Sequence, residues 1–522
     1  MAEIDQPIWP DVIRRIARRV KRAGGRPMVV GGTVLDLIED EEPRDWDIEV
    51  YGMTVDALVI VLEEFNPKRC GKSFAVIKVN HDGYEIDISI PFRKATEGVG
   101  AVISGDYFGW KGDILSNICR RNGGVPYDHF DPEMTPKEAA ERRDFTINSM
   151  SIDICCDGSE KVIIEDPFGG MDDWYEDRLK VTCPERFRED PLRGLRAMQL
   201  SARKAPRYTS ETVEIVRSMD MDDLPQERLF PEWEKLLMLS DHPSIGLTFL
   251  DDCGWLRFFP ELWEMKYWSG WSRGGIGNSN SKWRTKFDEG CPQDPDWHPE
   301  GNVWIHTKLV VDGAAQVRHL VDEEWRLAFM FAALLHDVAK PDATVLPGLH
   351  PTWPENGGET LTRVFMERLT GNAKLIDQTV SLVVNHLQPF QLCKEAKPSA
   401  WKRLHGKVRL DVLGWLSRAD WAGRRNRSAL TAFENGEKVE HRPSKLCFEW
   451  YKELGKEPIE PKLKGRHLIE HGMEPGPKFK VILDAAFQIQ LENPGFTTEE
   501  LWRRADSVET RGAKAPEREE QG

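Results

Sequence analysis

Polar and apolar positions form their clearest pattern between residues 29 and 50. An apolar pair leads into Gly31 and Gly32, a short helical pattern follows, and an extended run begins at Asp45. The spacing predicts a strand, a glycine turn, a short helix and a second strand. Because residues two apart on a strand share a face, Asp45 and Asp47 should project side by side.

The same stretch carries the first candidate chemistry. Two adjacent carboxylates repel each other unless a cation lies between them, and Mg²⁺ prefers oxygen ligands that it shares with substrate phosphates. Gly31 and Gly32 would let the backbone approach a phosphate, and the following helix would offer free N–H groups to it. A glycine turn beside a solvated strand edge is the alternative, but the two features in one unit favour a metal–nucleotide site.

A second alternating run covers residues 84–90, where Ile86 and Ile88 face one way and Glu85 and Asp87 the other. A carboxylate on this polar face could complete the metal site that the first strand begins. The alternative is an edge strand with a wet face.

Other patterns in the first half predict further elements. Residues 11–26 predict a basic helix whose apolar stripe docks it and whose basic face is solvated. Residues 55–64 predict a helix and residues 74–79 a strand. Residues 93–140, rich in Gly, Asp and Pro, predict a long flexible loop.

Two later segments carry charged residues suited to a nucleotide. Arg142 and Arg143 offer donors that fit a triphosphate. Asp190 lies three residues and Glu189 four residues before Arg193, so the three would share a helix face. Alternatively, Asp190 only caps that helix, ahead of a proline at the first helical position.

An Asp acceptor beside an Arg donor would match cytosine and adenine, which each present an exocyclic amine beside a ring-nitrogen acceptor. Guanine and uracil reverse this pattern and would leave buried polar groups unpaired. Protein side chains could therefore select CTP and ATP without a nucleic-acid template.

The second half of the chain brings histidines and carboxylates to the ends of predicted helices. His306 lies on a new helix, the apolar helix 327–335 leads into His336 and Asp337, and the helix 410–419 leads into Asp420. Nitrogen and oxygen ligands of this kind suit a divalent transition metal.

Composition bounds these interpretations. At 522 residues the chain should form three or four domains, and 40% hydrophobic with 30% charged residues is typical of a soluble globular protein. No apolar run would span a membrane, the N-terminus lacks a signal-peptide core, and nine scattered cysteines predict a reducing cytoplasm. A net charge of −16 argues against wholesale nonspecific nucleic-acid binding but allows a local basic track.

The segments GG…RDWD, ERRDFTINSM, DPFGG and REDPLRGLRA, in that order, resemble the class II tRNA nucleotidyltransferase and bacterial poly(A) polymerase family over roughly residues 28–240. The resemblance implies an α+β fold with a polymerase-beta-like nucleotidyltransferase head, a mixed sheet with helices, that holds two Mg²⁺ ions. An all-α neck that reads the incoming base would follow. The order H…HD…D resembles an HD-type metal phosphohydrolase domain, which some members of the family carry.

The resemblance also implies roles for individual residues. Asp45, Asp47 and Asp87 would bind Mg²⁺ and serve catalysis, with Glu85 as the runner-up for the third carboxylate. Arg143 and Asp144 would hold the triphosphate and sugar, and Asp190 and Arg193 would read the base, with Glu189 orienting Arg193. The nucleotide-binding residues expected in full are Gly31, Gly32, Arg143, Asp144, Asn148, Glu189, Asp190, Arg193 and Arg196.

In the HD domain, Ni²⁺, Mn²⁺, Co²⁺ or Fe²⁺ would be bound by His306, His336, Asp337 and Asp420. The family's further histidine after the HD pair has no clear match, because His350 aligns poorly. His386 stands where an auxiliary histidine would be. These features favour one metal ion over two, and the alternative is a domain that keeps its helices without a metal.

The leading hypothesis is a template-independent enzyme that adds CCA to tRNA 3′ ends from CTP and ATP, with an HD phosphohydrolase activity, in the cytoplasm and without a membrane. A poly(A) polymerase shares every motif, and a metal phosphohydrolase with a degenerate RNA-binding head is a third interpretation. The expected divisions are a basic helix at 1–27, the head at 28–182, the neck at 183–270, a linker at 271–300, the HD domain at 301–430, C-terminal helices at 431–504 and a disordered tail at 505–522.

Overall fold

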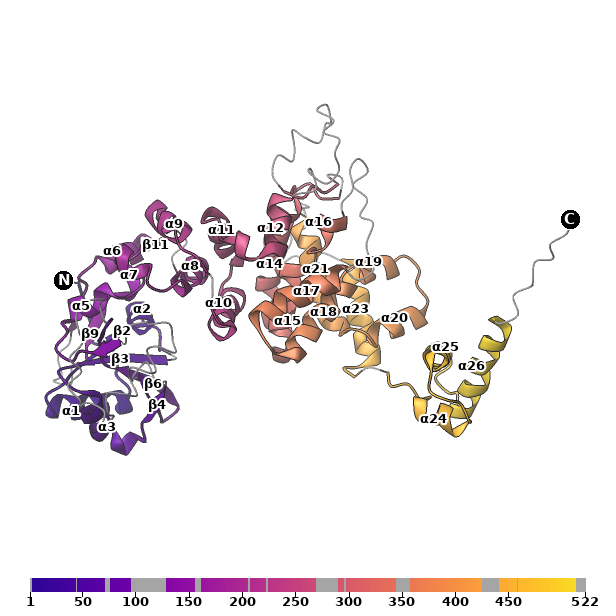
Figure 1. Cartoon of the computed structure of the whole chain (residues 1–522), viewed down its shortest axis with the longest axis horizontal. Helices are drawn as coiled ribbons and strands as arrows, with labels where there is room; N and C mark the ends of the chain where they lie inside the picture. The colour runs from indigo at the N-terminus through magenta and orange to yellow at the C-terminus, as the bar shows by residue number, and fades with distance from the viewer. Residues whose placement is uncertain are drawn as a thin grey trace, which may run out of the picture. The chain divides into compact units, whose positions relative to one another are not determined.

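The computed structural model (Figure 1) describes residues 2–43, 45–70, 76–94, 128–154, 161–204, 207–221, 224–268, 290–294, 297–343, 357–424, 441–457 and 459–512. The chain divides into two compact units, residues 1–222 and 223–522. The division falls inside the segment predicted as a single neck, so each unit takes part of that segment.

The first unit is built on a mixed eight-stranded sheet of order β1-β10-β9-β2-β3-β6-β5-β4. β3 and β6 pair in parallel and the other neighbours pair antiparallel. The strands are β1 (Ala2–Asp5), β2 (Arg26–Val30), β3 (Asp45–Tyr51), β4 (Lys68–Cys70), β5 (Val76–His81), β6 (Tyr84–Ser89), β9 (Ser151–Asp153) and β10 (Lys161–Glu165).

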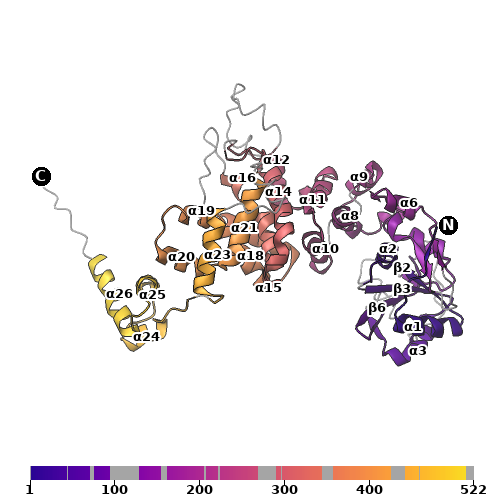
Figure 2. The same ribbon diagram turned by 180° about the vertical axis from the view of Figure 1, so that it is seen from behind.

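Helices cover the two faces of this sheet. α1 (Asp11–Arg22) and α3 (Val55–Val61) lie on one side, and α2 (Gly32–Ile38) lies on the other, in both views (Figures 1 and 2). α1 buries its apolar stripe and presents its basic residues outward, as predicted, and Arg15 and Arg19 pair with Glu64. The helix predicted over 55–64 ends earlier and continues as a 3₁₀ turn, Glu63–Phe65.

The prediction of a loop over 93–140 is wrong at both of its ends. β7 (Phe92–Lys94) pairs antiparallel with β8 (Asp128–Phe130), and α5 (Pro136–Glu141) follows. A capping box between Thr135 and Glu138 starts α5, so local hydrogen bonds outweigh the loop-like composition. Residues 95–127 lie outside the described part of the chain.

The first unit ends in short helices that pack beside the sheet. Phe145, which follows α5, stacks edge-on against Phe187 with ring centroids 5.4 Å apart. The remaining elements are α6 (Gly170–Tyr175), β11 (Arg178–Leu179), α7 (Pro184–Phe187), α8 (Leu192–Arg203), β12 (Arg207–Tyr208) and α9 (Ser210–Arg217).

Helices alone form the described part of the second unit. α14 (Val303–Val317) packs against both α15 (Glu323–Leu335) and α21 (Leu410–Gly423), and α15 packs against α18 (Ala373–Asn385). α15 is fully buried from Ala328 to Leu335, as its apolar sequence predicts. The other helices before the C-terminal group are α10 (Gln226–Leu239), α11 (Pro243–Asp252), α12 (Pro260–Tyr267), α16 (Lys340–Ala343), α17 (Gly357–Leu369), α19 (Gln388–Leu392), α20 (Pro398–His405) and α23 (Arg442–Leu454).

The C-terminal helices have their own small core. α24 (Gly465–Glu470), α25 (Pro477–Glu492) and α26 (Thr498–Gly512) enclose a buried cluster that includes Leu468 and Ala505. The tail predicted from residue 505 therefore begins too early, because α26 continues to residue 512. Among the described residues, none of the helices combines the length and the apolar character that crossing a membrane requires.

Candidate functional sites

Four carboxylates of the first unit lie on the neighbouring strands β3 and β6. The register of β3 and β6 places Asp47 beside Asp87 and Asp45 beside Glu85. Loss of surrounding water raises the pKa of Asp47; the charges of Asp87 and Asp45 raise it further, and Arg143 opposes the shift. This mutual repulsion favours a bound cation, and an oxygen-only ligand set fits Mg²⁺.

The glycine turn lies beside Asp47, one of these carboxylates. Gly31 has φ 68°, a conformation that favours glycine. A Cβ atom at Gly31 would lie 3.3 Å from Nη1 of Arg143 and 3.5 Å from Oδ2 of Asp47. The turn therefore brings the predicted arginine and the predicted metal ligand together, whereas Gly32 has open space around it.

Thr33, which the sequence analysis did not name, ties the turn to the strand. Its hydroxyl accepts a hydrogen bond from the backbone N–H of Asp47 at 3.0 Å and donates to the carbonyl of Asp45 at 3.2 Å. The side chain is almost fully buried. Its place directly after the two glycines, at the start of α2, is the signal that could have identified it.

Asp144, Asn148 and Arg196 form a second polar group. The Asp144 carboxylate accepts hydrogen bonds from Asn148 Nδ2 at 3.0 Å and from Arg196 Nε at 2.5 Å. Burial would raise the pKa of Asp144, but Arg196 and Asn148 hold it below its usual value. These contacts connect the segment after α5 to α8, and direct contact of the three residues with a nucleotide stays a prediction.

The predicted base-reading residues lie around the start of α8. Oδ1 of Asp190 accepts from the backbone N–H of Leu192 at 3.1 Å, which is the capping contact of the alternative interpretation. Arg193 donates to the carbonyls of Arg186 at 2.9 Å and Arg142 at 2.7 Å. Backbone carbonyls thus hold the Arg193 guanidinium.

Glu189 contributes to this region through ion pairs. It pairs with Arg186 at 3.0 Å and with Arg142 at 3.8 Å. Its charge also acts on Arg193, where it partly offsets the lowering of the arginine's pKa by burial. The expected orientation of Arg193 by Glu189 stays a prediction.

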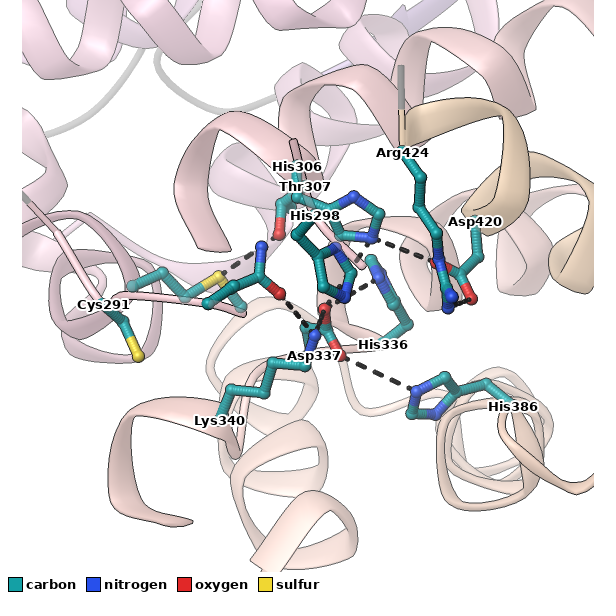
Figure 3. A network of polar contacts seen from close by, with 12 residues as sticks. Cys291, His298, His306, Thr307, His336, Asp337, Lys340, His386, Asp420 and Arg424 are labelled. Atoms are coloured by element: carbon teal, nitrogen blue, oxygen red, sulfur yellow. Dashed lines mark hydrogen bonds and ion pairs between the residues drawn. The ribbon is translucent and has the colours of Figure 1, made fainter. Parts of the chain in front are cut away.

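The second unit brings three histidines to one buried centre (Figure 3). Nδ1 of His336 lies 2.9 Å from the Ala333 carbonyl and Nδ1 of His386 lies 2.6 Å from the Val383 carbonyl. Each Nδ1 must therefore carry the proton, which leaves a lone pair on Nε2. Both Nε2 atoms are buried and lack a hydrogen-bond partner among the described residues.

Two carboxylates complete this centre. Asp337 lies 3.2 Å from Nε2 of His336 and 3.7 Å from Nε2 of His386, and Asp420 lies 3.0 Å from Nε2 of His306. The predicted His306, His336, Asp337 and Asp420 are thus together. His386, which the sequence analysis named only as an auxiliary histidine, joins them, whereas His350 lies outside the described residues.

Glu300, a carboxylate that the sequence analysis did not name, contacts Nδ1 of His306. Oε1 of Glu300 lies 2.7 Å from Nδ1 of His306 and 2.9 Å from Nδ1 of His298. Burial would raise the pKa of Glu300, but these two contacts lower it to about 2. The negative charge of Glu300 favours a proton on Nδ1 of His306, whose Nε2 faces Asp420. The unmatched buried Nε2 atoms and the mixed nitrogen and oxygen donors fit a transition metal.

Two cations flank the carboxylates of the centre. Lys340 Nζ lies 2.7 Å from Asp337, and Nη2 of Arg424 lies 2.9 Å from Asp420. Burial would raise the pKa of both aspartates, but Lys340 on one side and Arg424 on the other hold each pKa well below its usual value. The aspartates are therefore ionised and could act as metal ligands, and the two cations could attract an anion.

The fold and the first site define a class of enzyme. Residues 28–180 match the family model described as the poly A polymerase head domain, and the protein is a nucleotidyltransferase. Two relatives are each named multifunctional CCA protein. The one from Vibrio vulnificus (strain YJ016) is 29% identical over 418 residues, which cover 76% of this chain and 85% of the relative. The one from Acinetobacter baumannii (strain SDF) is 28% identical over 395 residues, which cover 74% and 79%. The chain is thus similar to multifunctional CCA proteins over about three quarters of its length, and its residues 28–180 are similar to the head domain of poly(A) polymerases.

Solved structures confirm the fold. The Bacillus stearothermophilus CCA-adding enzyme in complex with CTP superimposes with a TM-score of 0.56 at 18% identity and covers 96% of this chain and 98% of its own. The predicted α+β class, with a nucleotidyltransferase head followed by helices, is therefore confirmed.

We expect Asp47→Asn to stabilise the metal-free protein as the pH rises. The folded pKa of Asp47 is raised, so its destabilising effect is absent below the ordinary pKa of an aspartate, about 3.9, and grows as the pH rises above that value. In EDTA, the variant should gain melting temperature over wild type at about pH 7.5 and not at about pH 4. Added Mg²⁺ should raise the melting temperature of wild type and of the control variant but not that of Asp47→Asn. Glu3→Gln, at an exposed carboxylate on β1 of the same sheet, is the control. An equal response of both variants to Mg²⁺ would contradict the assignment.

Proposed function

We propose that the enzyme adds CCA to tRNA 3′ ends from CTP and ATP. The proposal is carried by the approach of Arg143 and Asp47 to the Gly31 turn, together with the strand register that places Asp87 beside Asp47. Acceptor oxygens for a cation and a donor for phosphate are what nucleotidyl transfer requires. The names of the two relatives favour CCA addition over poly(A) addition.

In this proposal, Asp45, Asp47 and Asp87 hold two Mg²⁺ ions. Bound Mg²⁺ would activate the attacking hydroxyl and offset charge on the triphosphate. Arg143 binds triphosphate oxygens beside the glycine turn, where the backbone leaves room for them. The RNA 3′-hydroxyl loses its proton and forms a bond to the α-phosphorus, and the bond to the β-phosphate oxygen breaks to release pyrophosphate.

Asp190 and Arg193 select the base. Arg193 is held by two carbonyls, and its guanidinium has five N–H donors, so donors remain for a ring nitrogen. Each carboxylate oxygen of Asp190 can accept more than one hydrogen bond, so the capping contact to Leu192 is compatible with acceptance from an exocyclic amine. Both CTP and ATP present that pair of groups.

We also propose that the second unit is a metal-dependent phosphohydrolase that acts on phosphomonoesters or 2′,3′-cyclic phosphates. The convergence of buried Nε2 atoms with Asp337 and Asp420 supports a single ion such as Ni²⁺, Mn²⁺ or Co²⁺. The metal would supply a nucleophilic water at neutral pH. Lys340 and Arg424, beside the two carboxylates, bind the phosphate of the substrate.

Sequencing the 3′ ends made on tRNA that lacks CCA, with CTP and ATP supplied, tests the main proposal. Wild type should make CCA ends and stop, whereas Asp45→Asn should add nucleotides at least about 100-fold more slowly, because the metal ligands position both reactants. Long adenosine tails would instead identify a poly(A) polymerase. Near-wild-type addition by folded Asp45→Asn would rule out the carboxylate site.

Arg193→Ala should relax base selection or abolish addition. Removal of the donor should narrow the preference for CTP and ATP over UTP and GTP by about tenfold or more. Single-nucleotide incorporation measures this ratio. Arg203→Ala, on the same helix α8, is the control. Unchanged rate and selectivity for Arg193→Ala would leave this segment with a capping role alone.

Asp337→Ala should abolish phosphate release from a 2′,3′-cyclic nucleotide while CCA addition persists, since the two sites use different residues. The two activities are assayed on one preparation with each metal, and Asp322→Ala is the control. Absence of hydrolysis by wild type with every metal would make the site structural, and loss of both activities in folded Asp337→Ala would refute independent sites.

Glu300→Gln should weaken metal binding, measured by equilibrium dialysis, by about 10–100-fold.

A further inference from the structure

The polar face of β3 continues beyond the two aspartates. Asp45, Asp47, Glu49 and Tyr51 follow one another at every second residue, so they share one face of the sheet. Along this face the strand passes from solvent into the interior, because the aspartates are exposed while Glu49 is 9% and Tyr51 6% exposed. A buried carboxylate next to a metal–nucleotide site needs a physical reason.

Glu49 is held at one end by the protein core. The Tyr51 hydroxyl donates to Oε2 of Glu49 at 2.7 Å. The tyrosine belongs to a buried cluster with Met28, Val30, Met134 and Ala139, which fixes its ring. Burial and the charge of Glu49 raise the pKa of Tyr51, so its hydroxyl keeps the proton that it donates.

The carboxylate of Glu49 also contacts Arg143. Nη2 of Arg143 donates to the same Oε2 atom at 3.4 Å. Nη1 of this guanidinium lies 3.3 Å from the position that a Cβ atom at Gly31 would take, and Oδ2 of Asp47 lies 3.5 Å from the same position. Arg143 therefore extends from the buried carboxylate to the place where the triphosphate is proposed to bind.

We propose that Glu49, seated by Tyr51, is the positioning residue that aims Arg143 at the triphosphate, an inference that rests on the proposed nucleotidyl transfer. A guanidinium carries five donors, so the contact to one carboxylate oxygen leaves donors for phosphate. Without Glu49, the long arginine side chain would sample many rotamers, and ordering it on binding would weaken affinity. One strand face then encodes both the metal ligands and the holder of the phosphate-binding arginine.

The opposing interpretation is that Glu49 only neutralises a buried cation. The two differ in ligand dependence. If Glu49 positions Arg143, its loss should affect each ligand in proportion to that ligand's contact with Arg143. The binding of CTP, which has β- and γ-phosphates, should then weaken much more than the binding of CMP. A purely structural role should affect the fold, and with it both nucleotides equally.

The experiment measures equilibrium binding of CTP and CMP to the full chain by calorimetry, with Mg²⁺ and without an RNA acceptor, so that no transfer occurs. Glu49→Gln should weaken the binding of CTP about three- to tenfold and the binding of CMP less than about twofold, because a neutral amide holds the guanidinium less firmly. Tyr51→Phe keeps the ring in its cluster and should give a smaller loss with the same selectivity. In an Arg143→Ala background, Glu49→Gln should have no further effect.

Glu64→Gln, which removes a carboxylate paired with Arg15 and Arg19, is the matched control and should bind both nucleotides normally. Equal losses for CTP and CMP, no loss, or losses additive with Arg143→Ala would overturn the inference. Where Glu49→Gln fails to fold, Tyr51→Phe decides by the same criteria. A wild type that shows this binding pattern but adds nothing to tRNA would refute the proposed function alone, and a wild type that does not bind CTP would refute both.

Discussion

The parallel register of β3 and β6 is the constraint on which the first site depends. Ile48 and Ile88 are paired in this register and fully buried, as are their neighbours Trp46 and Ile86. A shift by one residue would turn these apolar side chains to the polar face, where they would lose their buried apolar area and the stability that it provides. Burial of the apolar face therefore holds Asp47 and Asp87 side by side despite their repulsion. The free energy of burying the apolar face thus offsets the repulsion between the two carboxylates.

A second feature is common to both units: several residues of the candidate sites are held by another polar group. Thr33 fixes the backbone around the aspartates, and Arg196 and Asn148 fix Asp144. In the second unit Glu300 fixes the ring of His306. Such contacts reduce the conformational entropy that binding would otherwise remove, and they set which atoms remain available to a ligand.

The two sites differ in the chemistry of their donors. The candidate metal ligands of the first unit are carboxylate oxygens, a set that suits a hard, hydrated cation such as Mg²⁺, and the nearby cations Lys78 and Arg143 pair with carboxylates of this site. The second unit combines imidazole nitrogens with carboxylates and excludes water from them, a set that suits a transition metal. Burial lowers the pKa of His386 to about 4, so this histidine stays neutral and able to bind a metal at physiological pH. In the proposed function, these different donors would allow one chain to carry two metal chemistries.

The sequence by itself determined the local features of this protein. Strand alternation placed Asp45 with Asp47 and Asp87 on a polar face, and the apolar run of α15 ended at His336 and Asp337, because these patterns have periods of two and 3.6 residues. Local chemistry also explains the errors: the capping box of α5 and the continuation of α26 to residue 512 were hidden by polar, loop-like composition.

Only the tertiary structure decided which distant residues meet. Arg143 contacts Glu49 across 94 residues and His306 contacts Asp420 across 114, and no periodicity relates such positions. The tertiary structure also set which nitrogen of each histidine faces the buried centre, because folded neighbours supply an acceptor beside each Nδ1 atom. Sequence patterns act over a few residues, whereas these contacts exist only after the chain has packed.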